Sequence, residues 1–412
     1  MTATPPDVSA WVALGSIHLI NGAARLHPND AIIILPLAPA ESIVPSNTIV
    51  LRWKELGAVE LIAVRVDGTR VATVTVDGAQ LFAGMQLGNQ ARRVLAEVGA
   101  PPETHLSYVP MFYVRRDDKR PGAVYVHSQV RFRDDDACFI RVTDKPLVAA
   151  GRDELDWLRA GLELHAVHST FLNNHQCYYR KCFPGRELEY KYTASGPVDA
   201  WALTVELHRQ LRAGRLSGFI MEYRDEFQAW DYLNHLYEIG GPTADRGYVS
   251  FIPTTDGRHL IKRKWFADDA FVRREEHYHG VELPGTMDEY VSGVLRVQAT
   301  KLPSFRRVRY DVNFESVRTG HVFGVYFDHC SVLGAPDETL HQCELEYIRT
   351  RTAFTPSEDV VLSEMQGVAE WLEAFLRGQG HSGERGYYSK RSFLNDVVRR
   401  RPELGSAAAV MP

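Results

Sequence analysis

The sequence predicts an α+β protein made of antiparallel sheets: a β-rich region in the first 150 residues, then a barrel of charged strands clothed by helices. Three observations lead to this expectation. Short segments in which apolar and polar side chains alternate recur between turn residues. Helical spacing is confined to a few longer segments. In the later strands, the charged side chains fall on one face of each strand.

Composition narrows the class of protein. The 412 residues suffice for two or three domains at roughly 100–200 residues each. Hydrophobic residues (45%) and charged residues (24%) are at ordinary globular levels, which excludes disorder and coiled coil for the whole chain. Lys+Arg is 47 against Asp+Glu 52, so the net charge of -5 argues against a general nucleic-acid or anionic-membrane binder. Five cysteines and no signal peptide or membrane span indicate a cytoplasmic protein.

The first 150 residues are expected to form a separate β-rich domain. Leu61–Thr75 alternates apolar and polar residues around Asp67-Gly68, which is typical of a hairpin. Further strands are expected at Val124–Arg133 and Cys138–Val142, separated by a turn at Asp134–Asp136, and a helix near Asn89–Val98. No catalytic motif occurs in this region, and its role stays open.

Residues 151–402 are expected to form the second domain, with a connecting helix at 152–166, and 403–412 a flexible tail. Further helices are expected at Val198–Ala213, Tyr223–Tyr237, Ser357–Arg377 and Ser392–Arg399. Strands are expected at Glu187–Tyr192, Tyr248–Ile252, His259–Phe266, Phe271–His279, Leu295–Leu302, Arg306–Phe314, His321–Asp328 and Leu340–Thr350.

The faces of these strands separate charged from apolar side chains. Because side chains alternate along a strand, Glu187, Glu189 and Lys191 share one face. The other charged faces are Lys262 with Lys264; Arg273 with Glu275 and His277; Arg307 with Arg309, Asp311 and Asn313; Tyr326 with Asp328; and Gln342 with Glu344 and Glu346. Large apolar residues occupy the opposite faces, and in Phe271–His279 these are Val272 and Tyr278.

For one such strand, the simplest interpretation is an apolar face on the core and a charged face in water. Six strands with the same pattern, and helices available to cover the apolar faces, favour a closed or nearly closed barrel with the charges inside. Buried charge is costly unless it meets opposite charge. A phosphate-rich ligand with a divalent metal would supply partners for both the basic and the acidic side chains, since Lys and Arg bind phosphate oxygens and carboxylates bind Mg²⁺ or Mn²⁺.

A family resemblance rests on these residues. Glu187-Leu188-Glu189-Tyr190-Lys191 reproduces the ExExK signature of the CYTH, or triphosphate tunnel metalloenzyme, superfamily. The later elements follow the family's order: Lys262 and Lys264, Arg273-x-Glu275, Arg307 and Arg309, Asp328, Glu344-x-Glu346, and a Tyr387–Lys390 segment. The resemblance covers residues 185–400 and implies an eight-stranded antiparallel β tunnel that holds a triphosphate together with Mg²⁺ or Mn²⁺. Members hydrolyse inorganic triphosphate, thiamine triphosphate or RNA 5′-triphosphate, and others cyclise ATP or polymerise phosphate.

The resemblance also implies residue roles. Metal ligands would be Glu187, Glu189, Glu344, Glu346 and Asp328. Phosphate ligands would be Lys191, Lys262, Lys264, Arg273, Arg307 and Arg309. The catalytic set would comprise Glu187, Glu189, Glu275 and His277, with Glu275 a further metal or water-orienting carboxylate and His277 a candidate general acid or base.

The sequence leaves several alternatives open. Arg274 and Glu276 offer the same Arg-x-Glu spacing one residue further on. Residues 214–246 are expected to be a helical insert where other members have strands. The leading hypothesis is a metal-dependent hydrolase of a triphosphate or nucleoside triphosphate. The alternatives are a nucleotide cyclase or phosphoryl or nucleotidyl transferase, a non-catalytic module for a phosphorylated ligand, and a specialised biosynthetic enzyme on the same barrel. Oligomeric state is left open.

Overall fold

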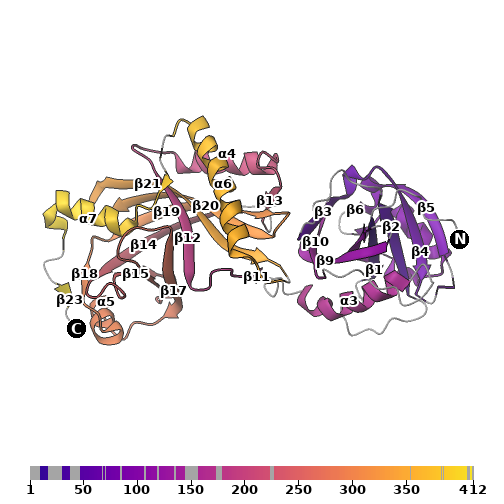
Figure 1. Ribbon diagram of the computed structural model, residues 1–412, viewed down its shortest axis with the longest axis horizontal. Coiled ribbons are helices and arrows are strands. Elements are labelled where there is room, and N and C mark those ends of the chain that lie inside the picture. The colour runs from indigo at the N-terminus through magenta and orange to yellow at the C-terminus, as the bar shows by residue number, and fades with distance from the viewer. Residues whose placement is uncertain are drawn as a thin grey trace. The chain divides into compact units, whose positions relative to one another are not determined.

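The computed structural model divides into two compact units (Figure 1). The residues it describes are 10–16, 30–37, 47–66, 68–69, 71–83, 86–105, 108–117, 120–133, 136–143, 156–172, 179–222, 227–352, 354–381, 383, 385–405 and 409–410. The first unit comprises residues 1–180 with the short segments 316–320 and 350–356, and the second comprises 181–315, 321–349 and 357–412. Within the described residues, no helix combines the length and the apolar composition needed to cross a bilayer.

The first unit is built on an eight-stranded sheet in the order β3-β10-β9-β8-β1-β2-β4-β5. Its strands are β1 (Ala10–Ser16), β2 (Ala31–Leu37), β3 (Thr48–Arg52), β4 (Ala58–Arg65), β5 (Val71–Asp77), β8 (Tyr108–Asp117), β9 (Arg120–Arg133) and β10 (Asp136–Arg141). A separate pair, β6 (Phe82–Ala83) and β7 (Gln86–Leu87), precedes helix α2 (Asn89–Glu97). The hairpin and the helix expected from the sequence are therefore confirmed, whereas Asp134 and Asp135 of the expected turn lie outside the described residues.

Two apolar cores cover the faces of this sheet. Helix α2 contributes Ala91, Val94 and Leu95 to one core. Helix α3 (Asp156–Leu172) contributes Trp157 and Leu158 to the other, and the Trp157 ring stacks on Trp11 of β1. The helix expected to connect the two halves therefore packs on the first sheet. β11 (Tyr179–Arg180) then pairs with the last residues of β21.

The second unit is a closed barrel of eight strands. Around the ring, the order is β19-β20-β21-β12-β17-β16-β15-β14, and β14 pairs with β19 to close it. The strands are β12 (Arg186–Thr193), β14 (Phe227–Ile239), β15 (Gly247–Pro253), β16 (His259–Trp265), β17 (Val272–Val281), β19 (Phe305–Ser316), β20 (His321–Val332) and β21 (Ala335–Arg351). The short strands β13 (Phe219–Met221), β18 (Ala299–Lys301), β22 (Arg385–Gly386) and β23 (Ala409–Val410) extend the sheet at its margins. The expectation of a closed barrel is confirmed.

The expected helix at 223–237 is wrong, because its described part belongs to strand β14. Trp230, Leu233 and Tyr237 are spaced like one face of a helix, which explains the error. In the structure, the run from Phe227 to Asn234 pairs residue by residue with β19, so the segment expected to be a helical insert supplies the closing strand. Aromatic residues favour strands once a partner strand is present.

Helices cover the outer face of one side of the barrel. Helix α4 (Ala200–Arg212) begins at Asp199, whose carboxylate accepts a hydrogen bond from the Ala202 backbone N–H at 2.9 Å. Leu203, Leu207 and Leu211 of α4 pack with helix α6 (Glu358–Gly378) on the outer faces of β12 and β19–β21. Figure 1 shows both helices lying along this side.

The other side of the barrel has less cover. A second outer core joins β14–β16 to β18 and to the turns that include α5 (Met287–Glu289) and a π-helical turn at Tyr290–Leu295. The outer face of β17 is exposed: Val272 is 40% and Tyr278 42% accessible. The cover expected from the helices at 198–213 and 357–377 is therefore found over β12 and β19–β21, and it leaves these two side chains of β17 partly open to solvent.

The C-terminal helix α7 (Lys390–Arg400) packs into one end of the barrel. Its Phe393, Leu394 and Val397 join a core with Cys330 and Leu340. Cys330 and Leu340 share strand faces with Asp328 and Gln342, which face inward, so α7 fills that end with apolar side chains. Beyond α7, Ala409–Val410 pairs with β18 within the segment expected to be a flexible tail.

Candidate functional site

The charged strand faces line the inside of the barrel. On β12, Glu187, Glu189 and Lys191 are all buried, whereas Leu188 and Tyr192 of the same strand pack in the outer core under α4 and α6. The alternation predicts this arrangement, because neighbouring side chains of a strand point to opposite faces. Ion pairs and hydrogen bonds connect the inward residues of different strands.

Strand β17 settles which Arg-x-Glu pair faces inward. The Arg273 side chain is 1% exposed, forms an ion pair with Glu189 and donates to the Tyr387 carbonyl at 3.0 Å. The Arg274 side chain is 59% exposed and pairs with Glu276 at 2.7 Å on the outer face. The interior therefore receives Arg273 and Glu275, and the neighbouring pair serves as a natural control.

Several cations surround two buried carboxylates, Asp328 and Glu344. Asp328, whose side chain is fully buried, accepts hydrogen bonds from Arg307 Nε at 2.9 Å, Arg309 Nε at 2.8 Å and Lys390 Nζ at 2.8 Å. Glu344 is paired with the same three cations and with Lys191, whose Nζ lies 2.5 Å from Glu344 Oε1. The carboxylate oxygens of both residues are thus already occupied by cations.

The electrostatics of Glu344 follow from this crowding. Burial by itself raises the pKa of a carboxyl group, but the charges of Lys191, Lys390 and Arg309 outweigh it and hold the pKa of Glu344 well below its ordinary value. Glu344 therefore carries its negative charge at neutral pH and keeps these cations in place.

A second group of charges surrounds Lys264 on β16. Its Nζ lies 2.5 Å from Glu187 Oε2 and 3.2 Å from Glu275 Oε1. Burial alone would lower the pKa of Lys264, yet Glu187 and Glu275 raise it well above its usual value. His277, which is 37% exposed, places Nε2 2.8 Å from Glu275 Oε1. The predicted catalytic pair of Glu275 and His277 is in direct contact.

Two inward ionisable side chains, Lys262 and Glu346, make neither a hydrogen bond nor an ion pair within the described part of the chain. Among the described residues, Lys262 makes no hydrogen bond or ion pair, although Lys191, Lys264, Arg273, Arg307, Arg309 and Lys390 are all paired. Glu346 likewise makes none within the described part of the chain, and it stands opposite Glu189 in the β12–β21 ladder. Burial, then the charges of Glu187, Glu275 and Glu189, raise the pKa of Glu346 to about 8. The described interior thus holds one lysine without a partner and one carboxyl group that burial and the neighbouring carboxylates keep largely protonated at neutral pH.

The carboxylates near Glu346 could hold a metal. No group of three or more His, Cys, Asp or Glu among the described residues is arranged as a preformed metal site. The donor chemistry nevertheless fits Mg²⁺ or Mn²⁺, because Glu187, Glu189 and Glu346 are neighbouring carboxylates and hard cations prefer oxygen ligands. Burial, then Glu189 and Glu275, also raise the pKa of Glu187, because several carboxyl groups are crowded together in this part of the interior.

Sequence reasoning missed several interior residues. Lys390 is the first residue of α7, and besides the two carboxylates it donates to Gln342 Oε1 at 2.7 Å. A lysine at the start of a helix with an apolar face at Phe393, Leu394 and Val397 is the signal that could have indicated a buried helix end. Trp230 and Tyr232 were missed because their strand was interpreted as a helix.

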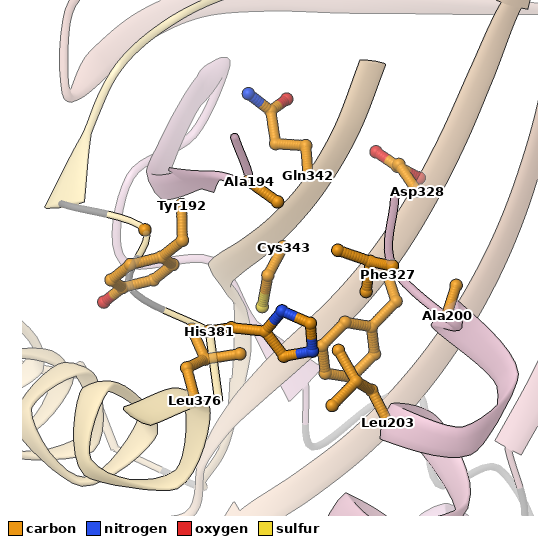
Figure 2. A pocket seen from close by; sticks show the side chains of 12 residues that line it. Tyr192, Ala194, Ala200, Leu203, Phe327, Asp328, Gln342, Cys343, Leu376 and His381 are labelled. Atoms are coloured by element: carbon orange, nitrogen blue, oxygen red, sulfur yellow. The ribbon is translucent and has the colours of Figure 1, made fainter. Parts of the chain in front are cut away.

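A pocket also lies on the outer side of the barrel wall (Figure 2). It encloses about 350 Å³, part of it open to solvent, between the strands, α4 and the end of α6. The side chains of Phe327, Cys343, Leu203, Leu376 and His381 converge there, while those of Asp328 and Gln342 point away. The pocket is largely apolar and is separate from the charged interior.

Comparisons with known proteins give little further guidance. No family model matches the chain, and no curated protein matches it. Among solved structures, the chain is similar to the Pct1 RNA triphosphatase of S. pombe in complex with the Spt5 CTD, with 14% sequence identity and a TM-score of 0.23. The match covers 58% of this chain and 93% of that chain. The same enzyme alone gives 13% identity, coverage of 54% and 86%, and a TM-score of 0.23. At such TM-scores the likeness adds nothing to what the closed barrel itself shows.

Proposed function

We propose that the second unit binds a triphosphate-containing substrate inside its barrel together with Mg²⁺ or Mn²⁺, and hydrolyses it. The observation that carries this proposal is a pair of inward side chains without partners, Lys262 and Glu346, among described residues in which the other inward Lys and Arg side chains are all ion-paired. A polyanion with a divalent cation would satisfy both at once. The ExExK resemblance of Glu187–Lys191 supports the same assignment.

In this proposal, the chain's residues divide into three roles. Lys262, with Lys264, Arg273, Arg307 and Arg309, binds phosphate oxygens and neutralises charge that builds up during transfer. Glu187, Glu189 and Glu346 hold the cation, whose chemistry when bound is to withdraw charge from the phosphate oxygens. Glu275, whose Oε1 lies 2.8 Å from His277 Nε2, orients the attacking water, and His277 is the candidate base that accepts its proton.

Glu344 and Asp328 contact more cations than Glu187, which pairs with Lys264, or Glu189, which pairs with Lys191 and Arg273, and this difference gives them another role from the one implied by the family resemblance. Each contacts three or more cations, so we propose that they position Arg307, Arg309 and Lys390 for phosphate instead of ligating metal. Lys390 then joins the phosphate-binding set from the end that α7 fills.

Phosphate release from inorganic tripolyphosphate, ATP, GTP and thiamine triphosphate, with Mg²⁺ or Mn²⁺, tests the proposal. Arg273→Met should lower kcat/KM by about a hundredfold, the loss expected when a transition-state contact to a charged group is removed. The matched Arg274→Met, one residue away on the outer face, should stay within about twofold. Glu187→Ala/Glu189→Ala should abolish turnover. Binding without turnover in the unchanged protein would favour a non-catalytic module. A cyclic product detected by mass spectrometry would favour a cyclase. The absence of both binding and turnover would contradict the proposal.

A further inference from the structure

Trp230 differs from the rest of the barrel lining. It lies on β14, two residues before Tyr232, so both side chains occupy the inward face. Its indole Nε1 donates a hydrogen bond to Asp311 Oδ1 of β19 at 2.9 Å. The residue is nevertheless 51% exposed. A large aromatic ring therefore stands in water at the end of the barrel away from α7, amid charged neighbours.

The position of Trp230 places it next to the proposed phosphate ligands. It stands opposite Arg309 in the β14–β19 ladder. Tyr232, the next inward residue of β14, is influenced by the charges of both Arg309 and Lys262. A triphosphate held by these two cations, with its substituent pointing to the end of the barrel at which Trp230 is exposed, would place that substituent beside the Trp230 ring.

The ring is suited to one kind of group. An inorganic phosphate chain has no apolar or aromatic surface that could contact the ring, whereas a planar base binds more tightly when it stacks on it. Such stacking tolerates different bases. The hydrogen bond to Asp311 holds the indole in one orientation, so less rotamer freedom is lost when a base stacks.

We propose that Trp230 is a stacking platform for the base of a substrate in which a nucleoside carries a 5′-triphosphate. Trp230 is thus a specificity-determining residue that separates base-bearing triphosphates from inorganic tripolyphosphate. This inference rests on the proposed function of the barrel. Free nucleoside triphosphates and the 5′-triphosphate end of RNA share the required chemistry.

The test compares kcat/KM for ATP, for a short RNA with a 5′-triphosphate, and for inorganic tripolyphosphate. Trp230→Ala should lose about tenfold or more on both base-bearing substrates and stay within about twofold on tripolyphosphate, and Trp230→Phe should restore most of the loss. Trp201→Ala is the matched control, because Trp201 is 50% exposed and lies on α4 against Tyr310, outside the barrel. It should change none of the three.

The outcomes separate the two proposals. If Trp230→Ala lowers activity equally on all three substrates, or leaves the base-bearing ones unchanged, the stacking role is overturned while triphosphate hydrolysis stands. If the unchanged protein neither binds nor hydrolyses any of the three, the function proposed for the barrel fails, and the stacking role fails with it. A larger loss on RNA than on ATP would support the role and identify the RNA end as the source of the base.

Discussion

Lys390 offers a direct measure of how strongly α7 is tied to the barrel interior. The change to make is Lys390→Met, which keeps the unbranched stem of the side chain and removes its ammonium group. Nζ lies 2.8 Å from Asp328 and 2.7 Å from Gln342 and also contacts Glu344, and the Lys390 side chain is 7% exposed. Removing one partner from a buried ion pair typically costs about 3–5 kcal/mol, because the remaining charge is left without compensation.

Asp328 and Glu344 keep Arg307 and Arg309 as partners, so we expect the lower limit, about 3 kcal/mol. For a unit of this size, that corresponds to a fall of roughly 6–12 °C in Tm. The assay is urea unfolding followed by a probe in the second unit. The control is Arg306→Met, because Arg306 pairs with Asp231 where both side chains are about half exposed, and such pairs contribute about 0–1 kcal/mol.

Salt separates the two variants further. High salt screens exposed pairs and leaves buried pairs largely unaffected. The cost of Arg306→Met should therefore vanish in about 1 M NaCl, where the Debye length is about 3 Å, while that of Lys390→Met should persist. A free-energy loss for Lys390→Met within about 0.5 kcal/mol of the control would refute the inference that Lys390 holds the inner carboxylates.

Three further predictions concern stability. Gly247→Ala should destabilise the second unit several times more than Gly257→Ala. Both glycines have positive φ, but a Cβ at position 247 would lie 2.0 Å from the Lys264 carbonyl oxygen, whereas a Cβ at position 257 would have nothing within 4 Å. Urea midpoints measure the difference, and equal losses of stability would count against the close approach of β15 and β16. Leu207→Ala should cost about 2–5 kcal/mol, because Leu207 lies on the buried face of α4. The exposed Val205→Ala on the same helix should cost less than about 0.5 kcal/mol, and similar values for both would contradict the packing of this helix. In the first unit, burial lowers the pKa of His127 to about 3 and that of His165 to about 4, so below pH 6.5 the unfolded chain binds more protons than the folded one. The free energy of unfolding should therefore be highest above pH 6.5 and fall by about 1.4 kcal/mol per pH unit for each histidine down to about pH 4. A free energy of unfolding that stays constant between pH 7 and pH 5 would contradict this prediction.

Sequence alone determined the side of each strand that carries charge. Glu187, Glu189 and Lys191 face inward and Leu188 faces outward because alternation is a local property of an extended chain. The same local rule, with the helical spacing of Leu203, Leu207 and Leu211, located the helix that covers the outer face. The order of charged motifs therefore sufficed to predict a barrel with a charged interior.

Tertiary structure decided which charges meet. Strand β14 was interpreted as a helix because Trp230, Leu233 and Tyr237 have helical spacing, and only the partner strand β19, about 80 residues away, makes the extended form favourable. The same long-range pairing distinguishes Arg273 from Arg274 and brings Lys390 of α7 to Asp328. It also leaves Lys262 and Glu346 with neither a hydrogen bond nor an ion pair to any residue that the structure describes. The distance between charges on different strands depends on how the barrel closes, and no local pattern in the chain encodes that distance.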